Sequence, residues 1–170
     1  MKHKLAVTVE NNPGVLSRVS GLFSRRGYNI DSLVVSDTEE PSVSRMTIVV
    51  RGDEVTIEQV TKQLHKLIEV IKVNDITNED IVERQLLMIR VSCDRETRGE
   101  IKTLMDIFHA RIIDVGRRSM IIEATGDDDK IEAIIKTLRP FGVQEIVKTG
   151  VSAMVRSPKE KKIVRLNAVD

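Results

Sequence analysis

The sequence contains very few aromatic residues. Tryptophan is absent, tyrosine occurs once and phenylalanine three times in 170 residues. Domains of the RRM type bind RNA by stacking bases on aromatic side chains of a βαββαβ sheet. The strands expected in this chain do not carry such side chains, so RNA binding is the disfavoured alternative.

Long apolar runs, an excess of one charge and disulfide partners are also missing. Met1 to Lys4 lead directly into a strand-like run, so we expect neither a signal peptide nor a membrane span. Lys and Arg number 27 against 26 Asp and Glu, which leaves no net field that would attract nucleic acid or a membrane. The single cysteine, Cys93, cannot form an internal disulfide. A cytoplasmic protein is the expectation.

No catalytic or metal-binding pattern occurs. His3, His65 and His109 lack the i, i+4 pairing of a metal site, and no cysteine cluster accompanies them. Cys93 lies near Arg90 and Arg95, but no motif supports a nucleophile. Histidines at helix surfaces or ends and a packing or loop cysteine are the favoured interpretations. A small enzyme that uses Cys93 or a histidine is one alternative.

The first half of the chain alternates between strand and helix periodicity. Residues 5–9 alternate as a strand, a helix is predicted from Pro13 to a C-terminal Gly27, and strands are predicted over 30–35, 43–51 and 70–76. The apolar stripes of the two helices are Val15, Leu16, Val19, Leu22 and Phe23, then Ile57, Val60, Leu64, Leu67 and Ile68. This βαββαβ order predicts a ferredoxin-like α+β unit with both helices on one face of an antiparallel sheet. The other face or the edge then needs cover, and a second copy is one solution.

After a linker at 78–80 the same pattern starts again. Helical stripes at 101–108 and 131–138 separate strands near 87–91, 112–115, 120–122 and 143–147. Ile113-Asp114 repeats Ile30-Asp31, and Ile107-Phe108 repeats Leu22-Phe23. We therefore expect two tandem ferredoxin-like domains, 1–77 and 83–150, followed by a basic tail over 151–170. The tail is either a solvated terminus or a docking arm.

The turn before the first helix is suited to an anion. Asn12 is a good N-cap and Pro13 suits the first helical position, so the helix is expected to begin at Pro13. The N–H groups of Gly14 and Val15 then lack internal partners at the positive end of the helix dipole. A carboxylate can bind there, and Gly14 has no Cβ to block it. A well-capped helix without a ligand is the simpler interpretation.

The second half has Cys93 to Gly99 in place of this turn and is expected to keep the fold without the site.

Several segments resemble one family. Glu10 to Val19, Gly21 to Leu33, Ser44 to Ile48 and Lys62 to Leu67 resemble the ACT domain of the regulatory small subunit of acetohydroxyacid (acetolactate) synthase. The resemblance is close over the first 77 residues and looser over the rest.

The resemblance implies a dimeric, non-catalytic regulatory subunit without a cofactor of its own. Its catalytic large subunit carries thiamine diphosphate, FAD and Mg²⁺, and the small subunit activates it and confers feedback inhibition by valine. The region 83–148, with or without the tail, is the candidate for docking. A free-standing amino-acid sensor that controls another protein is the alternative.

The predicted valine site joins these two lines of reasoning. N–H groups around Gly14 and Val15 would bind the carboxylate, and the side-chain oxygens of Asn11 and Asn29, or strand carbonyls, would accept from the ammonium group. Val15, Ile30 and Leu33 would form the apolar wall. In ACT dimers the start of the helix in one chain faces the start of the strand in the other, so the site is expected across an interface.

Overall fold

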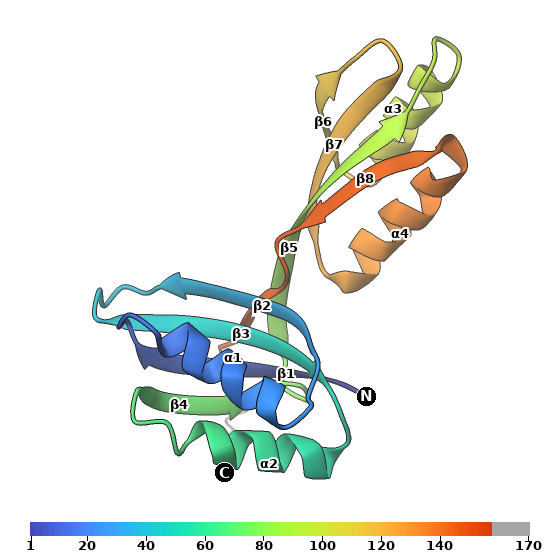
Figure 1. The fold of residues 1–170 in the computed structure, drawn as a ribbon. Coiled ribbons are helices and arrows are strands. Elements are labelled where there is room, and N and C mark those ends of the chain that lie inside the picture. The colour runs from blue at the N-terminus through green and yellow to red at the C-terminus, as the bar shows by residue number, and fades with distance from the viewer. Residues whose placement is uncertain (158–170) are drawn as a thin grey trace, which may run out of the picture.

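The computed structural model describes residues 1–157, which form two units joined by a long strand (Figure 1). The first unit consists of β1 (Lys2–Glu10), α1 (Val15–Arg25), β2 (Ile30–Asp37), β3 (Val43–Arg51), α2 (Glu54–Leu64) and β4 (Val70–Asp75). Its sheet is antiparallel with the strand order β2-β3-β1-β4. The predicted ferredoxin-like order is therefore confirmed.

The second unit repeats this arrangement. Its elements are β5 (Ile81–Ser92), α3 (Thr97–Ile107), β6 (Arg111–Val115), β7 (Ser119–Gly126), α4 (Asp128–Leu138), the short 3-10 helix η1 (Arg139–Phe141) and β8 (Val143–Lys148). The strand order β6-β7-β5-β8 matches that of the first sheet, and all three pairings are antiparallel.

The two units correspond at a constant spacing. The register of the first strand shifts after Thr8 in one unit and after Arg90 in the other. Bulges follow Ile30 and Ile112, and left-handed residues end the first helix of each unit at Gly27 and His109. Each pair lies 82 residues apart, which corrects the repeats expected from sequence. The counterpart of Ile30-Asp31 is Ile112-Ile113, and that of Leu22-Phe23 is Leu104-Met105.

Each unit has its own hydrophobic core between sheet and helices. The first is centred on Leu5, Val7, Phe23 and Ile48, and the second on Leu87, Ile89, Ile122 and Ile131. Two predicted core positions are wrong. Leu16 is 42% exposed and Ile68 is 93% exposed. Leu16 lies on the solvent side of the first turn of α1, and Ile68 lies beyond α2, which ends at Leu64.

The chain after Gly150 does not begin as a tail. Ser152–Val155 form strand β9, which pairs antiparallel with Ile81–Arg84 of β5. We call this pair of segments the ribbon. It lies on the face of the first sheet away from the helices, where Val151 and Ala153 pack against Ala6, Val49 and Ile76. The expected boundaries at 83 and 151 are thus displaced, because apolar residues on both sides of the second unit return to cover the first sheet.

Within the described residues, no helix is long and apolar enough to span a membrane. The part of the predicted basic tail from 158 to 170 lies outside the residues that the structure describes.

Candidate functional site

The turn between β1 and α1 is built around Gly14. Gly14 is the N-cap of α1 with φ of 85°, a left-handed conformation that a right-handed helix cannot contain, so α1 begins at Val15 and not at Pro13. The prediction that Asn12 caps the helix is wrong: Gly14 is the N-cap, α1 has no side-chain cap, and the Nδ2 of Asn12 donates to Glu10 Oε2 at 2.9 Å. A Cβ built on Gly14 would have no heavy atom within 4 Å. The turn is therefore open on the side where a ligand would approach.

The N-terminus of α1 differs from those of the other helices. First-turn N–H groups of α2, α3 and α4 donate to the carboxylates of Asp53, Asp94 and Asp127 at 2.8, 2.8 and 2.9 Å. The α1 terminus has no side-chain cap and no acidic residue in its first turn. The prediction that Val15 N–H lacks an internal partner is wrong, because it donates to Asn12 O at a long distance of 3.4 Å. No carboxylate of the chain neutralises the positive end of α1, which suits an external anion.

Asn11 is fixed beside this turn. Its backbone N–H donates to Ser42 O at 2.7 Å, and its Nδ2 donates to Pro41 O at 3.0 Å. These bonds tie the β1–α1 turn to the loop between β2 and β3. An amide nitrogen only donates, and the bond to Pro41 fixes its position, so the Oδ1 of Asn11 is the atom that can accept from a ligand.

Asn29 is held in a similar way at the other end of α1. Its Nδ2 donates to Asp31 Oδ1 at 2.9 Å, and Arg51 Nε donates to Asp31 Oδ2 at 2.6 Å. The hydrogen bond from Arg51 lowers the pKa of Asp31 below its ordinary value, and the bond from Asn29 acts in the same direction. Sequence reasoning missed Asp31 and Arg51. The signal that could have found Asp31 was its place in the matched strand start, two residues after Asn29.

One chain does not bring the six predicted residues together. Asn11, Gly14 and Val15 lie at the start of α1, whereas Asn29, Ile30 and Leu33 follow its end. A helix of 11 residues is about 16 Å long. Ile30 and Leu33 are partly buried against the first core, and Val15 is 3% exposed within it. A single ligand can therefore contact both groups only if they come from different chains.

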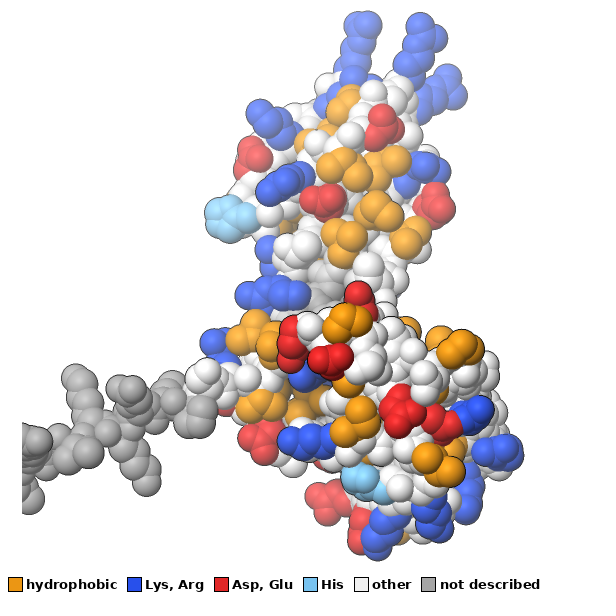
Figure 2. All heavy atoms as spheres, turned by 90° about the vertical axis from the view of Figure 1, so that its left-hand side faces the viewer, with side chains coloured by type: hydrophobic (Ala, Val, Ile, Leu, Met, Phe, Trp, Pro, Cys, Tyr) orange, Lys and Arg blue, Asp and Glu red, His pale blue; other side chains and the backbone are white. Residues whose placement is uncertain are grey.

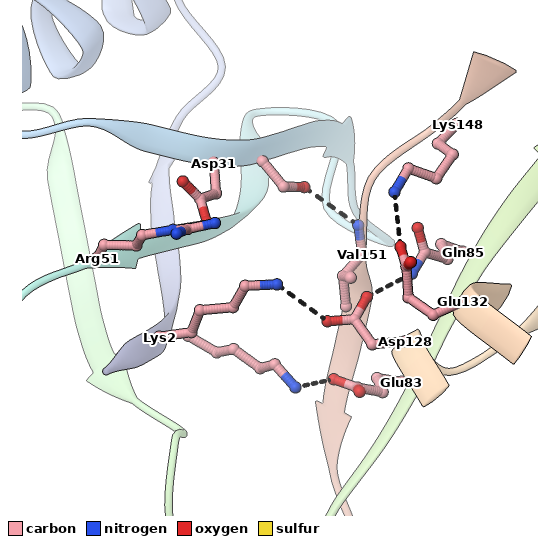
Figure 3. A network of polar contacts seen from close by, with 11 residues as sticks. Lys2, Asp31, Arg51, Glu83, Gln85, Asp128, Glu132, Lys148 and Val151 are labelled. Atoms are coloured by element: carbon pink, nitrogen blue, oxygen red, sulfur yellow. Dashed lines mark hydrogen bonds and ion pairs between the residues drawn. The ribbon is translucent and has the colours of Figure 1, made fainter. Parts of the chain in front are cut away.

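A cavity of about 700 Å³ lies between the two units, beside the second of these groups. Asn29, Ile30 and Leu33 line one wall, and residues of α4 and β8 line the other. Figure 3 shows the charged side chains that face it, which are Lys2, Arg51 and Lys148 with Asp31, Asp128 and Glu132. We call this cavity the cleft.

The residues considered for catalysis lie apart from this region. Cys93 is 6% exposed and belongs to the second core, in accord with a packing role. His3 is buried in β1, and His65 and His109 are exposed at the ends of helices in different units. Among residues 1–157, no three His, Cys, Asp or Glu side chains are grouped so that they could hold a metal ion.

Two family models match this chain. Residues 5–72 match the AHAS small subunit-like ACT domain, and residues 84–157 match the small subunit of acetolactate synthase. The two matches correspond to the two units of the fold.

Individual relatives agree with the family models. A protein of Archaeoglobus fulgidus named "probable acetolactate synthase small subunit" is 59% identical over 94% of this chain and 100% of its own length. The acetolactate synthase small subunit of Mycobacterium leprae is 52% identical over 92% of this chain and 93% of its own. The crystal structure of the acetolactate synthase small subunit from Thermotoga maritima matches with a TM-score of 0.85 at 45% identity, covering 94% of this chain and 99% of that one. The resemblance seen in the sequence is thus confirmed, and the chain belongs to the family of regulatory small subunits of acetolactate synthase.

Proposed function

We propose that this chain binds valine through its first unit, and that it activates the catalytic large subunit of acetolactate synthase and makes it subject to feedback inhibition. The chain itself is proposed to be non-catalytic, with thiamine diphosphate, FAD and Mg²⁺ belonging to the large subunit. The observation that carries the ligand site is the N-terminus of α1, which has no side-chain cap and where a Cβ on Gly14 would meet no heavy atom within 4 Å.

Recognition of the two charged groups of an amino acid follows from this geometry. The carboxylate takes the place that Asp53, Asp94 and Asp127 fill at the other helices, bound by N–H groups at the positive end of α1. The ammonium group donates to the side-chain oxygens of Asn11 and Asn29, whose nitrogens already donate elsewhere. A zwitterion satisfies both halves of the site at once.

We propose that two chains form this site together. Strand β2 is at the edge of the first sheet, where its outer backbone groups can pair with β2 of a second chain. In an antiparallel pair, the Ile30 end of one strand lies beside the Asp37 end of the other. The Asp37 end carries the β2–β3 loop to which Asn11 is bonded. Such pairing brings Asn29 of one chain toward Gly14 of the other.

Calorimetric titration of valine into the purified chain, with leucine, isoleucine and serine for comparison, tests the site. Gly14→Asp should weaken valine binding by roughly tenfold or more, since it places a negative charge where the carboxylate binds. Gly14→Asn is the matched control, because it has the same shape and the same left-handed backbone without the charge. Equal binding by both variants would contradict the proposed pose.

Complementation tests the two-chain arrangement. Chains with Gly14→Asp and chains with Asn29→Ala each have one defective half-site, so each should bind weakly alone. When the two are refolded together, every mixed dimer contains one site with both halves intact, and tight binding should return. Gly14→Asp mixed with Asn11→Ala is the control, since both changes lie in the same half. No recovery in the first mixture would refute a shared site.

The second unit is our candidate for docking the large subunit. The face of its sheet away from α3 and α4 carries exposed apolar side chains among charged ones, as the upper lobe in Figure 2 shows. Met88 is 38% and Val147 46% exposed there, next to the Arg90–Glu145 ion pair of 2.8 Å. An exposed apolar patch rimmed by charges is typical of a protein contact surface.

Activation of the large subunit by titrated small subunit measures this docking. Val147→Glu should raise the concentration needed for half activation by about tenfold, the effect of losing one strong contact. Val55→Glu on α2, where the valine is 61% exposed, is the control in the first unit. Unchanged activation by Val147→Glu, or an equal loss with Val55→Glu, would exclude this face.

A further inference from the structure

The ribbon packs firmly against the first unit. Val151 and Ala153 are 4% and 2% exposed, and they pack with Ile81 against the first sheet. Lys4 on β1 forms an ion pair with Glu83 on the ribbon, and Arg45 Nη2 donates to Ala153 O at 2.9 Å. These apolar and polar contacts hold the ribbon to the sheet, so any change in the angle between the units must occur beyond it.

The chain crosses from the ribbon to the second unit at two short segments. One is Arg84-Gln85 in β5, where pairing with β9 ends and pairing with β7 begins, and the other is Thr149-Gly150 between β8 and β9. Beside this crossing, Thr149 N donates to Leu86 O at 3.1 Å and Leu86 N donates to Thr149 Oγ1 at 3.1 Å. Gly150 has φ of 88°, which interrupts the extended backbone. We call these two segments the joint.

Across the cleft the two units make only weak contact. Lys2 Nζ lies 3.8 Å from Asp128 Oδ2, with side chains 52% and 37% exposed, and Gln85 Nε2 holds the other oxygen of Asp128 at 2.5 Å (Figure 3). The hydrophobic clusters of the described residues lie within the first unit, within the second, or between the first sheet and the ribbon. An exposed ion pair contributes at most about 1 kcal/mol, so the Lys2–Asp128 pair adds a small free energy to the closed arrangement that a bound ligand can offset.

The start of β2 connects the proposed valine site to this joint. Val151 N donates to Ser32 Oγ at 3.3 Å, and a Cβ on Gly150 would overlap that hydroxyl. Ser32 follows Asp31, which binds both Asn29 and Arg51. A ligand that engages Asn29 therefore acts on a strand segment that touches the joint directly.

We propose that the second unit pivots at the joint, that the Lys2–Asp128 pair favours the closed cleft, and that an amino acid bound at the start of β2 changes the proportion of closed molecules. This rests on the proposed function and supplies its regulation: ligand occupancy in the first unit alters how the second unit is presented. Ligand and cleft are then linked reciprocally.

Distances between spin labels measure the pivot. Labels at Val55 and Ile107, which are 61% and 67% exposed on helices of different units, are introduced with Cys93 replaced by alanine. Labelled chains are diluted with unlabelled ones so that distances within a chain dominate. Lys2→Glu should lengthen and broaden the distribution without ligand, and Lys2→Glu with Asp128→Lys should restore it. Lys148→Glu is the matched control, because Lys148 faces Glu132 of its own unit at 3.5 Å.

Valine must then shift the distribution of distances between the two labels. The direction of this shift fixes whether Lys2→Glu weakens or tightens valine binding. If valine shortens the distance, Lys2→Glu must weaken valine binding, and if valine lengthens it, Lys2→Glu must tighten binding. A distribution that saturating valine leaves unchanged, or a coupling of the opposite sign, overturns the proposal. If valine does not bind at all, the proposed function fails, but the ligand-free distance distributions still test whether the second unit pivots at the joint. Equal distributions for Lys2→Glu and the unaltered chain overturn the proposed pivot.

Discussion

Gly14 and Gly27 are left-handed residues at opposite ends of α1, and they serve different purposes. Gly27, with φ of 72°, ends the helix, and His109 takes the same conformation in the second unit. Gly14 opens the N-terminus, and its counterpart 82 residues later is Glu96, a residue in the right-handed region. Termination of the helix is therefore common to both units, whereas the open N-terminus is found in the first alone.

Asp31 should contribute to stability in a pH-dependent way. Its pKa is lowered in the folded chain by Arg51, so its contribution is present above the ordinary carboxyl pKa and is lost as the pH falls through the lowered value. Asp31→Asn should cost roughly 0.5 to 1 kcal/mol at pH 7, because Arg51 is largely exposed. Urea unfolding of both proteins should show this difference shrinking as the pH falls below the ordinary carboxyl pKa of about 3.9 and disappearing below the lowered pKa of folded Asp31. A difference that persists at lower pH would assign the effect to packing.

Ile30 and Ile112 occupy equivalent positions, each preceding a bulge and partly buried against its own core. Replacing either with alanine should destabilise its unit by about 1 to 3 kcal/mol. Ile30→Ala should also weaken valine binding, whereas Ile112→Ala should leave it unchanged. Calorimetric titration of the two variants at a temperature where both are folded distinguishes them. Equal loss of affinity would mean that the site is misplaced.

At the scale of elements, strand β5 belongs to two sheets. Its first four residues, Ile81 to Arg84, pair with β9 on the first unit, and Gln85 to Ser92 form the centre of the second sheet. The ribbon covers part of the first sheet with residues from the same chain. The sequence suggested that a second copy of the chain could cover this face of the first sheet. The ribbon of the same chain covers part of it instead.

Ala153→Leu tests the packing of the ribbon. Ala153 is 2% exposed against the first sheet, and a larger side chain there should cost about 1 to 3 kcal/mol by overpacking. Ser152→Leu, at the neighbouring exposed position, should change stability by less than about 0.5 kcal/mol. Urea unfolding followed by the fluorescence of Tyr28 reports on the first unit. Similar midpoints for the two variants would show that the ribbon does not pack as described.

At the scale of the molecule, two cores joined through a narrow crossing should unfold separately. Tyr28 packs against the first core, and it is the one tyrosine in a chain without tryptophan. Ile122→Ala removes a fully buried side chain from the second core and should cost about 2 to 5 kcal/mol there. Circular dichroism should then show an earlier partial transition, while Tyr28 fluorescence keeps its midpoint. A matching shift of both signals would mean that the units unfold as one.

Local patterns predicted the elements well and their ends less well. The third strand, Val43 to Arg51, agrees in full with β3, because Gly52-Asp53 breaks the strand directly after it. The start of α1 was misplaced by two residues, since Asn12 and Pro13 resemble a helix start whereas the left-handed Gly14 delays the helix to Val15. The bond from Arg51 to Asp31 joins residues 20 apart in sequence and has no local signal.

The sequence by itself determined the two βαββαβ units, their cores and the family, because alternation, helical periodicity and the Asn-Pro-Gly turn are local properties of the chain. Only the tertiary structure decided that residues 152–155 return to the first sheet, and that the proposed site residues fall into two groups at opposite ends of α1. It also decided that the start of β2 touches the joint between the units through Ser32 and Val151. These features depend on pairing and packing between segments far apart in the sequence, where no local pattern specifies the partner.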